Sequence, residues 1–260
     1  MSAADEPTVQ VIAAIPVKRP GPFSRLRILL HGGPAKLILA LLMAIALSAL
    51  LWATRGLIFN FWLGTLEWSL GWLQHDGLQV TNLNLLLPQL SELQSPALRL
   101  HVDRPESIDY VAHLVSALLV YLLAALLLPT PWRGAVRALA LLHAACTAFS
   151  AGLQIFPYEV DDHTRALSVF TLMMLAALPI VMAATHSIVE RSHERRALAT
   201  LLIATWLIIS LPFKLIAHAL LIQTFSPLIM PLLFIAAGPA FDILVVTALY
   251  AWAVSWRHGS

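Results

Sequence analysis

The chain has 260 residues, of which 59% are apolar and only 12% are charged. An ordinary soluble domain carries about 25% charged residues, so this composition excludes an ordinary soluble domain and indicates a protein that faces lipid. The net charge of +2, without a basic soluble domain, argues against a nucleic-acid partner, and the single cysteine excludes an intramolecular disulfide framework and paired-cysteine metal sites.

The N-terminal segment is basic and precedes the first apolar run. We expect residues 1–35 to form a cytoplasmic tail, partly disordered, with a short basic helix on the membrane surface over 23–30. No cleavage pattern is evident, so the run Leu37–Thr54 is interpreted as an uncleaved signal anchor that follows five basic residues: Lys18, Arg19, Arg25, Arg27 and Lys36.

Six apolar stretches are long enough to cross a bilayer, whose hydrocarbon core of about 30 Å needs roughly 20 helical residues. They predict an all-α polytopic membrane protein, with a six-helix transmembrane bundle over residues 36–256 and a cytoplasmic C-terminus at 257–260. The predicted spans are Leu37–Thr54, Tyr110–Leu128, Ala135–Ile155, Ala166–Val189, Ala197–Ile222 and Leu228–Trp256.

The segment Gly56–Gln74 is nearly as apolar as a span, but it contains Asn60, Glu67 and three tryptophans. Because tryptophan prefers the headgroup boundary, we interpret this segment as an amphipathic helix on the outer face, with a seventh span as the alternative. It would open a small periplasmic cap over residues 56–109. The residues of this cap that we expect to contact a partner are Trp62, Trp68, Trp72, Leu98 and Leu100.

The basic residues in the loops alternate in the way that sets membrane orientation. With the N-terminus inside, the cytoplasmic side receives eleven basic and four acidic residues, and the outer side receives four basic residues, Arg55 among them, and nine acidic ones. This bias predicts that both termini are cytoplasmic. The compact form and the arginine-rich inner loops favour the inner membrane of a bacterium.

Few ionisable residues lie within the predicted spans, and each is a default functional candidate because charge is costly in lipid. Lys214 and His218 share one face of the fifth span, and Asp242 lies in the sixth. The favoured interpretation is structural: either Lys214 and Asp242 pair and join two helices, or the lysine extends toward the outer interface while Asp242 bonds to a backbone group. A proton or ion site is the alternative. Prolines at 179, 212 and 239, the last within Gly238-Pro239, predict kinks in the last three spans.

The third span carries His143, Cys146, Thr147 and Ser150 among many alanines. A cysteine beside a histidine can form a nucleophilic thiolate, as in membrane transpeptidases of the exosortase type. The sequence departs from that family, because Cys146 is followed by Thr147-Ala148 rather than Ser-Gly and Arg191 falls on the cytoplasmic side. Close packing of a small-residue helix is the favoured interpretation.

No phosphate-binding loop, serine elbow or zinc motif is present in the sequence, and we expect no cofactor and no metal. The favoured function is a non-enzymatic membrane subunit or accessory factor of an envelope assembly, secretion or export system, bound to lipid and to a protein partner. A small transporter or channel component that uses Lys214, His218 and Asp242 is the first alternative. An intramembrane enzyme around Cys146 and His143 is the second.

Overall fold

The structure is a computed structural model that describes residues 33–73, 78–84, 94–153, 159–188 and 193–255. The expected surface helix over 23–30 and the C-terminus at 257–260 lie outside these residues. The described elements, in chain order, are α2 (Gly33–Ala53), α3 (Arg55–Leu73), β1 (Leu78–Asn84), β2 (Gln94–Leu100), α4 (Ser107–Leu127), α5 (Thr130–Leu153), α6 (Val160–Ile188), α7 (His193–Phe225), the short 3-10 helix η1 (Pro227–Ile229), α8 (Met230–Ala236) and α9 (Pro239–Ser255).

The protein is an all-α polytopic membrane bundle, as the sequence predicts. In the described residues, five segments are long and apolar enough to span a membrane: Ser107–Leu127, Thr130–Leu153, Val160–Thr185, Ala197–Phe225 and Pro227–Ala253. A bent pair, Ile38–Ala53 with Arg55–Leu73, meets the same test when its two helices are taken together. Counted as one crossing, this pair brings the total to six.

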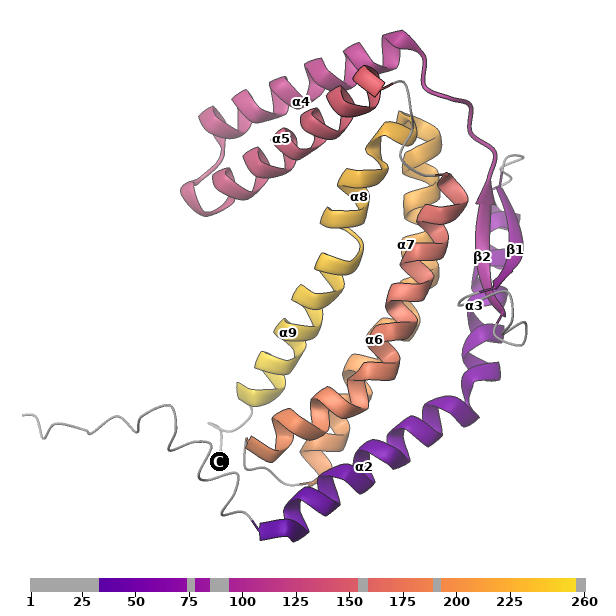
Figure 1. Cartoon of the computed structure of the whole chain (residues 1–260), viewed down its shortest axis with the longest axis vertical. Helices are drawn as coiled ribbons and strands as arrows, with labels where there is room; N and C mark the ends of the chain where they lie inside the picture. The colour runs from indigo at the N-terminus through magenta and orange to yellow at the C-terminus, as the bar shows by residue number, and fades with distance from the viewer. Residues whose placement is uncertain (1–32, 74–77, 85–93, 154–158, 189–192, 256–260) are drawn as a thin grey trace, which may run out of the picture.

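The spanning segments alternate in direction along the chain. The start of α2, the end of α6 and the end of α9 lie toward one end of the molecule, and the β-strands and the starts of α4 and α6 lie toward the other (Figure 1). The described ends of the chain, at Gly33 and Ser255, therefore lie toward the same end, as an even number of crossings requires.

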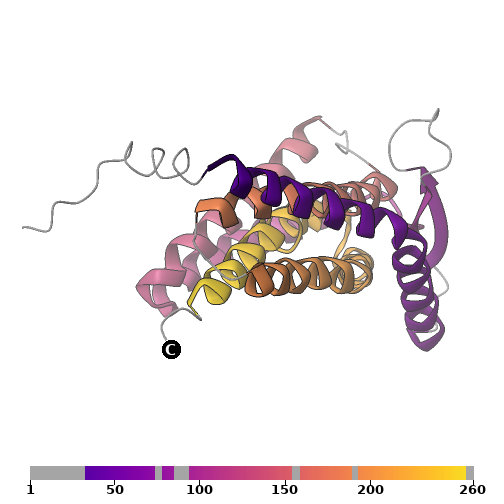
Figure 2. The same cartoon turned by 90° about the horizontal axis from the view of Figure 1, so that it is seen from below.

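Helices α2 and α3 meet at an elbow, where their axes differ by 49°. α2 packs along α6, whereas α3 turns away to pack on α7 and on the β-hairpin. Seen from below, α3 points away from the plane of the other helices (Figure 2). The predicted tryptophan-rich helix is thus a real element, and one of its faces belongs to the protein core: Trp62, Leu66 and Ser69 are buried.

The two strands of the cap form an antiparallel hairpin, with Leu78 opposite Leu100 and Asn84 opposite Gln94. Thr164 Oγ1 at the start of α6 donates a hydrogen bond to the Leu98 carbonyl at 3.0 Å. Leu98 is fully buried, so the hairpin is part of the folded core and not a separate domain.

Helices α4 and α5 form a hairpin of their own that leans away from the other helices (Figure 1). Helix α4 begins with a capping box, in which the Asp109 carboxylate accepts a hydrogen bond from the Glu106 backbone N–H at 2.8 Å. Outside this hairpin, α5 packs mainly on η1 and α8.

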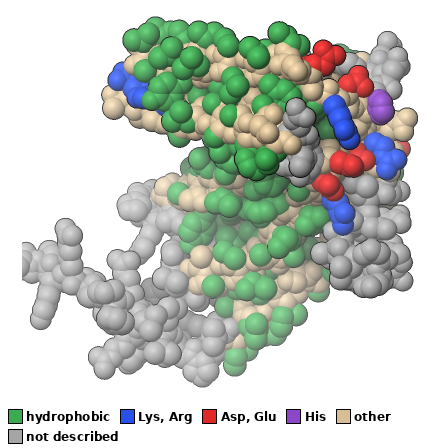
Figure 3. Space-filling view, turned by 45° about the horizontal axis from the view of Figure 1, so that its top comes forward, with side chains coloured by type: hydrophobic (Ala, Val, Ile, Leu, Met, Phe, Trp, Pro, Cys, Tyr) green, Lys and Arg blue, Asp and Glu red, His purple; other side chains and the backbone are tan. Residues whose placement is uncertain are grey.

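Charged side chains gather at one edge of the molecule, while the neighbouring surface is predominantly apolar (Figure 3). The exposed members come from β2, from the connection between β2 and α4, and from the residues around the start of α6: Arg99, Asp103, Arg104, Glu106, Glu159 and Asp162. Within this edge, Arg99 Nε lies 3.1 Å from Asp161 Oδ2 in an ion pair that joins the hairpin to α6. This edge marks the polar end of the bundle.

Candidate functional site

Lys214 of α7 and Asp242 of α9 form an ion pair in the interior of the bundle. The Lys214 Nζ donates a hydrogen bond to Asp242 Oδ2. The side chain of Lys214 is 11% exposed and that of Asp242 only 1%. The pairing predicted from the sequence is therefore present, and it joins two helices that are neighbours in the fold.

Two histidines continue this polar site toward the start of α6. His218 lies one turn beyond Lys214 on α7, and its Nδ1 is 2.9 Å from His163 Nε2 of α6. Both imidazoles are buried, with exposures of 1% and 0%. Side chains from three helices thus form one buried polar cluster, which we call the ion-pair cluster: His163, Lys214, His218 and Asp242.

The position of Asp242 depends on a break in the last span. The helix ends at Ala236 and begins again at Pro239, which places Asp242 in the first turn of α9. The Asp242 backbone N–H donates to the Gly238 carbonyl at 3.1 Å. A Cβ atom on Gly238 would lie 2.4 Å from the Phe234 carbonyl oxygen, so only glycine fits without a shift of the backbone. The predicted kink is present at Gly238-Pro239.

The Asp242 carboxylate is only half satisfied. Oδ2 accepts from Lys214, but Oδ1 is buried and has no hydrogen-bond partner in the described part of the chain. A buried carboxylate oxygen without a donor is costly, and such exceptions are found at functional sites as well as in structural pairs. Among the described residues, this oxygen and His218 Nε2 are the two buried polar atoms of the ion-pair cluster that lack a hydrogen-bond partner.

A proline in α7 is compensated from α3. Pro212 lies inside α7 and has no backbone N–H, so the Ile208 carbonyl lacks its usual helical donor. The indole Nε1 of Trp62 donates to this carbonyl at 2.7 Å. Trp62 is 1% exposed and fastens α3 to the bundle.

His143 of α5 lies in a second histidine pair. His113 Nε2 lies 3.0 Å from the Phe225 carbonyl, and His113 Nδ1 lies 2.9 Å from His143 Nε2. Because a carbonyl only accepts, His113 Nε2 carries the proton when this imidazole is neutral, and His143 then donates to Nδ1. The two rings join α4 and α5 to the end of α7.

Cys146 is half-buried and its thiol is free. Within the described residues, no hydrogen bond joins Cys146 to His143, whose Nε2 is engaged by His113. Thr147 and Ser150, on the same helix, are buried with His143. The polar face of α5 therefore packs inward, and the cysteine–histidine pair expected of a thiolate nucleophile is not formed.

The histidines do not converge on a metal site. Across the described ranges, no group of three or more His, Cys, Asp and Glu side chains could hold a metal ion. His113 and His143 meet each other, whereas His218 meets His163.

The partner-binding candidates of the cap separate into two groups. Trp62, Leu98 and Leu100 pack inside the protein, with exposures of 1%, 0% and 7%, so they are removed from the surface that a partner could contact. Trp68 and Trp72 are 68% and 79% exposed. The alternation of polar and apolar residues predicts the β2 strand, but it does not reveal that the bundle covers its inward face.

His163 was not among the residues selected from the sequence. It precedes the apolar run that begins at Ala166, and its partner His218 lies 55 residues later in the chain. A signal was nevertheless present, because His163-Thr164 interrupts a charged stretch immediately before a span.

Comparison with protein-family models, curated proteins and solved structures found no match for this chain.

Proposed function

We propose that this protein is a non-enzymatic membrane subunit or accessory factor of an envelope assembly, secretion or export system in the inner membrane of a bacterium. The observation that carries the proposal is the outward face of α3. One face of this helix is fixed to the core, while an apolar stripe at helical spacing points outward: Leu57, Phe61, Trp68 and Trp72. The two exposed tryptophans lie one helical turn apart.

This stripe suits a partner helix better than a site of chemistry. Large aromatic side chains supply contact area at low entropic cost and are enriched at protein interfaces. A shallow hollow of about 390 Å³ lies beside the stripe, between α3 and Phe213 of α7. The ionisable groups of the interior, in contrast, are engaged mainly with each other.

Site-specific crosslinking tests the proposal. A photoreactive amino acid at position 68 or 72 is expected to form one discrete protein adduct in cells, and the double variant Trp68→Ala/Trp72→Ala should lose co-purification of that protein with unchanged yield. Trp132 of α5 is the matched control, because it is 66% exposed in a different helix. Adducts with lipid alone, or equal adducts from position 132, would contradict the proposal.

The orientation belongs to the same proposal and has its own test. The distribution of basic residues between the loops favours a cytoplasmic position for both termini. A reporter that is active only outside the cytoplasm should be inactive when fused after Arg257 and active when inserted near Asp162. Activity at the C-terminus would mean that α2 and α3 cross the membrane separately.

A small transporter or channel component is the second candidate, and the open Asp242 oxygen is the observation that favours it. The ion-pair cluster lies beside a broken helix, an arrangement that transporters use to bind ions. In proteoliposomes, a proton or cation flux that Asp242→Asn abolishes would support this function. Asp161→Asn, in the surface ion pair with Arg99, is the control and should leave the flux unchanged. No flux above that of empty vesicles would exclude it.

A further inference from the structure

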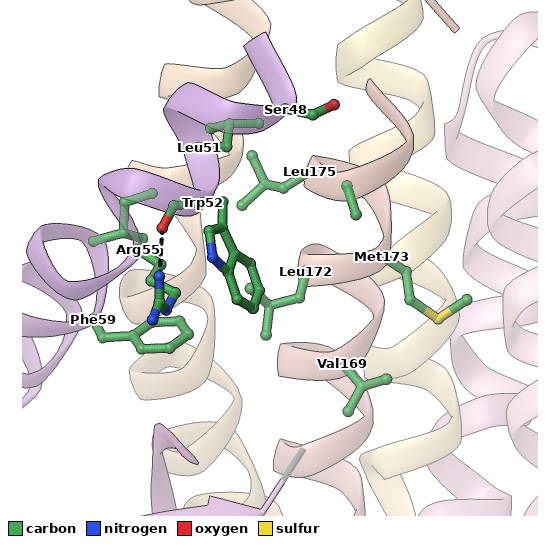
Figure 4. A pocket seen from close by; sticks show the side chains of 11 residues that line it. Ser48, Leu51, Trp52, Arg55, Phe59, Val169, Leu172, Met173 and Leu175 are labelled. Carbon is green, nitrogen blue, oxygen red and sulfur yellow. Dashed lines mark hydrogen bonds between the residues drawn. The ribbon is translucent and has the colours of Figure 1, made fainter. Parts of the chain in front are cut away.

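An apolar cavity of about 410 Å³ lies between the α2–α3 elbow and α6, away from the ion-pair cluster. Its volume falls in the range of about 300 to 1,000 Å³ that is typical of small-molecule sites. The elbow contributes Trp52, Arg55 and Phe59 to one wall, and α6 contributes Leu172 and Leu175 to the other (Figure 4). Ala176 of α6 also lines the cavity. The α6 residues lie in the middle third of the candidate span Val160–Thr185, so we expect this cavity to face lipid.

Arg55 is the one cation among the residues that line this cavity. Its guanidinium carbon lies 4.3 Å from the centre of the Trp52 ring, and Nη1 donates to the Trp52 carbonyl at 3.0 Å (Figure 4). Within the described residues, no carboxylate pairs with Arg55. The charge count from the sequence placed Arg55 in an outer loop, whereas the structure places it beside the middle of α6.

The remaining donors of Arg55 define what the cavity can hold. A guanidinium has five N–H donors, and stacking on Trp52 occupies its face while leaving edge donors available. An unpaired charge among apolar side chains is costly, and a guanidinium edge matches the oxygens of a phosphate in a bidentate arrangement. A ligand that fits this cavity is therefore an apolar chain that carries one anionic group.

We propose that the elbow cavity binds an anionic phospholipid, with an acyl chain between the elbow and α6 and the phosphate at Arg55. The lipid is drawn from the surrounding bilayer. Its chain covers Trp52, which is 58% exposed, and its phosphate supplies acceptors for the remaining donors of Arg55. This site is independent of the partner surface on α3.

Binding of defined lipids to the delipidated, purified protein tests the proposal by native mass spectrometry. The probes are phosphatidylglycerol and phosphatidylcholine with identical chains, and inorganic phosphate as a competitor. Phosphatidylglycerol is expected to bind about tenfold more tightly than phosphatidylcholine, since only its phosphate is free of a neighbouring cation. Equal binding of the two lipids, or full displacement by millimolar phosphate, would overturn the proposal.

Matched variants locate the site. Arg55→Gln should abolish the preference for phosphatidylglycerol, and Arg55→Lys should keep part of it. Ala176→Phe fills the cavity and should weaken the binding of both lipids. Arg104→Gln, which removes an exposed arginine elsewhere, should bind like the wild type. A diazirine on the acyl chain should label 51–59 and 169–176, and unchanged binding by folded Arg55→Gln would contradict the assignment.

Discussion

The spans of α7 and α4 have similar hydropathy but differ strongly in how much of each is buried in the protein. Of the most apolar 18-residue stretch in each span, 61% is buried in the α7 span Ala197–Phe225 and 11% in the α4 span Ser107–Leu127. In lipid, burial of apolar side chains gives little driving force, because the surrounding chains are equally apolar. The difference in burial therefore indicates that polar side chains, and not hydrophobicity, determine which helices form the interior.

The polar contacts of the two regions support this view. The core helices are joined by the Lys214–Asp242 pair, by the two buried histidines and by the Trp62 indole. In the described residues, the α4–α5 hairpin is tied to α7 by one polar connection, from His113 to the Phe225 carbonyl. We expect the core to behave as one rigid unit and the hairpin to move more freely against it.

Breaking the ion pair should have the largest effect on the core. Lys214→Met or Asp242→Leu alone leaves an uncompensated buried charge, and each should lower the free energy of unfolding by about 3–5 kcal/mol. The double variant should recover most of this loss, because apolar replacement of a whole buried pair is often nearly neutral. Unfolding of the purified protein in mixed micelles measures all three changes.

A surface ion pair is the control for these single and double variants of Lys214 and Asp242. Arg99→Met and Asp161→Leu remove an ion pair whose arginine side chain is 60% exposed, and each should change stability by no more than about 1 kcal/mol. Strictly additive losses at Lys214 and Asp242 would show that the two charges do not interact in the membrane. Recovery of stability without recovery of the partner adduct or of ion flux would assign them a functional role.

A side chain at the glycine of the helix break should have the next largest effect. Gly238→Ala places a methyl group against the Phe234 backbone and 3.0 Å from Leu167 Cδ2, so we expect a loss of about 1–3 kcal/mol in unfolding free energy. Gly64→Ala in α3 is the control, since a Cβ there meets nothing within 4 Å and alanine is the better helix former. Equal losses for both variants would refute the argument from close approach.

The Trp62 indole should matter only because Pro212 is present. Trp62→Phe leaves the partly buried Ile208 carbonyl without its donor, and we expect a loss of about 1–3 kcal/mol. Pro212→Ala restores a backbone N–H to that carbonyl, so the loss caused by Trp62→Phe should shrink in the Pro212→Ala background. The same unfolding assay on the four proteins gives the coupling energy. A loss that is equal in both backgrounds would mean that packing of the ring, and not its N–H, is what stabilises α3.

The membrane fold was predictable from the sequence because length and apolarity suffice to identify spans. Lys214 and Asp242 were predictable as a pair, since two opposite charges in lipid must find a partner. The strands were predictable from their alternation of side chains, and the kink from Gly238-Pro239. These features share one property: each depends on the local pattern or on a rare residue type.

The remainder of the site depends on contacts between distant parts of the chain. The sequence shows that Pro212 frees a carbonyl, but no local pattern indicates that Trp62, 146 residues away, supplies the donor. The same holds for His163 with His218. Arg55 was placed in a loop because it interrupts two apolar runs, whereas a bend of 49° keeps both helices against the bundle.

The attachment of the α4–α5 hairpin gives the smallest expected effect and tests the comparison directly. His113→Phe removes both hydrogen bonds that this ring makes, to His143 and to the Phe225 carbonyl. Hydrogen bonds between membrane helices are worth about 0.6 kcal/mol on average and at most about 1.7 kcal/mol, so global stability should fall only slightly. The distance distribution between spin labels on α4 and α7 should broaden, while that between labels on α6 and α7 should not. His101→Phe, an exposed histidine before α4, is the control and should change neither distribution. If both distributions broaden in His113→Phe, the hairpin and the core form one cooperative unit, and the contrast between the two regions does not extend to their motion.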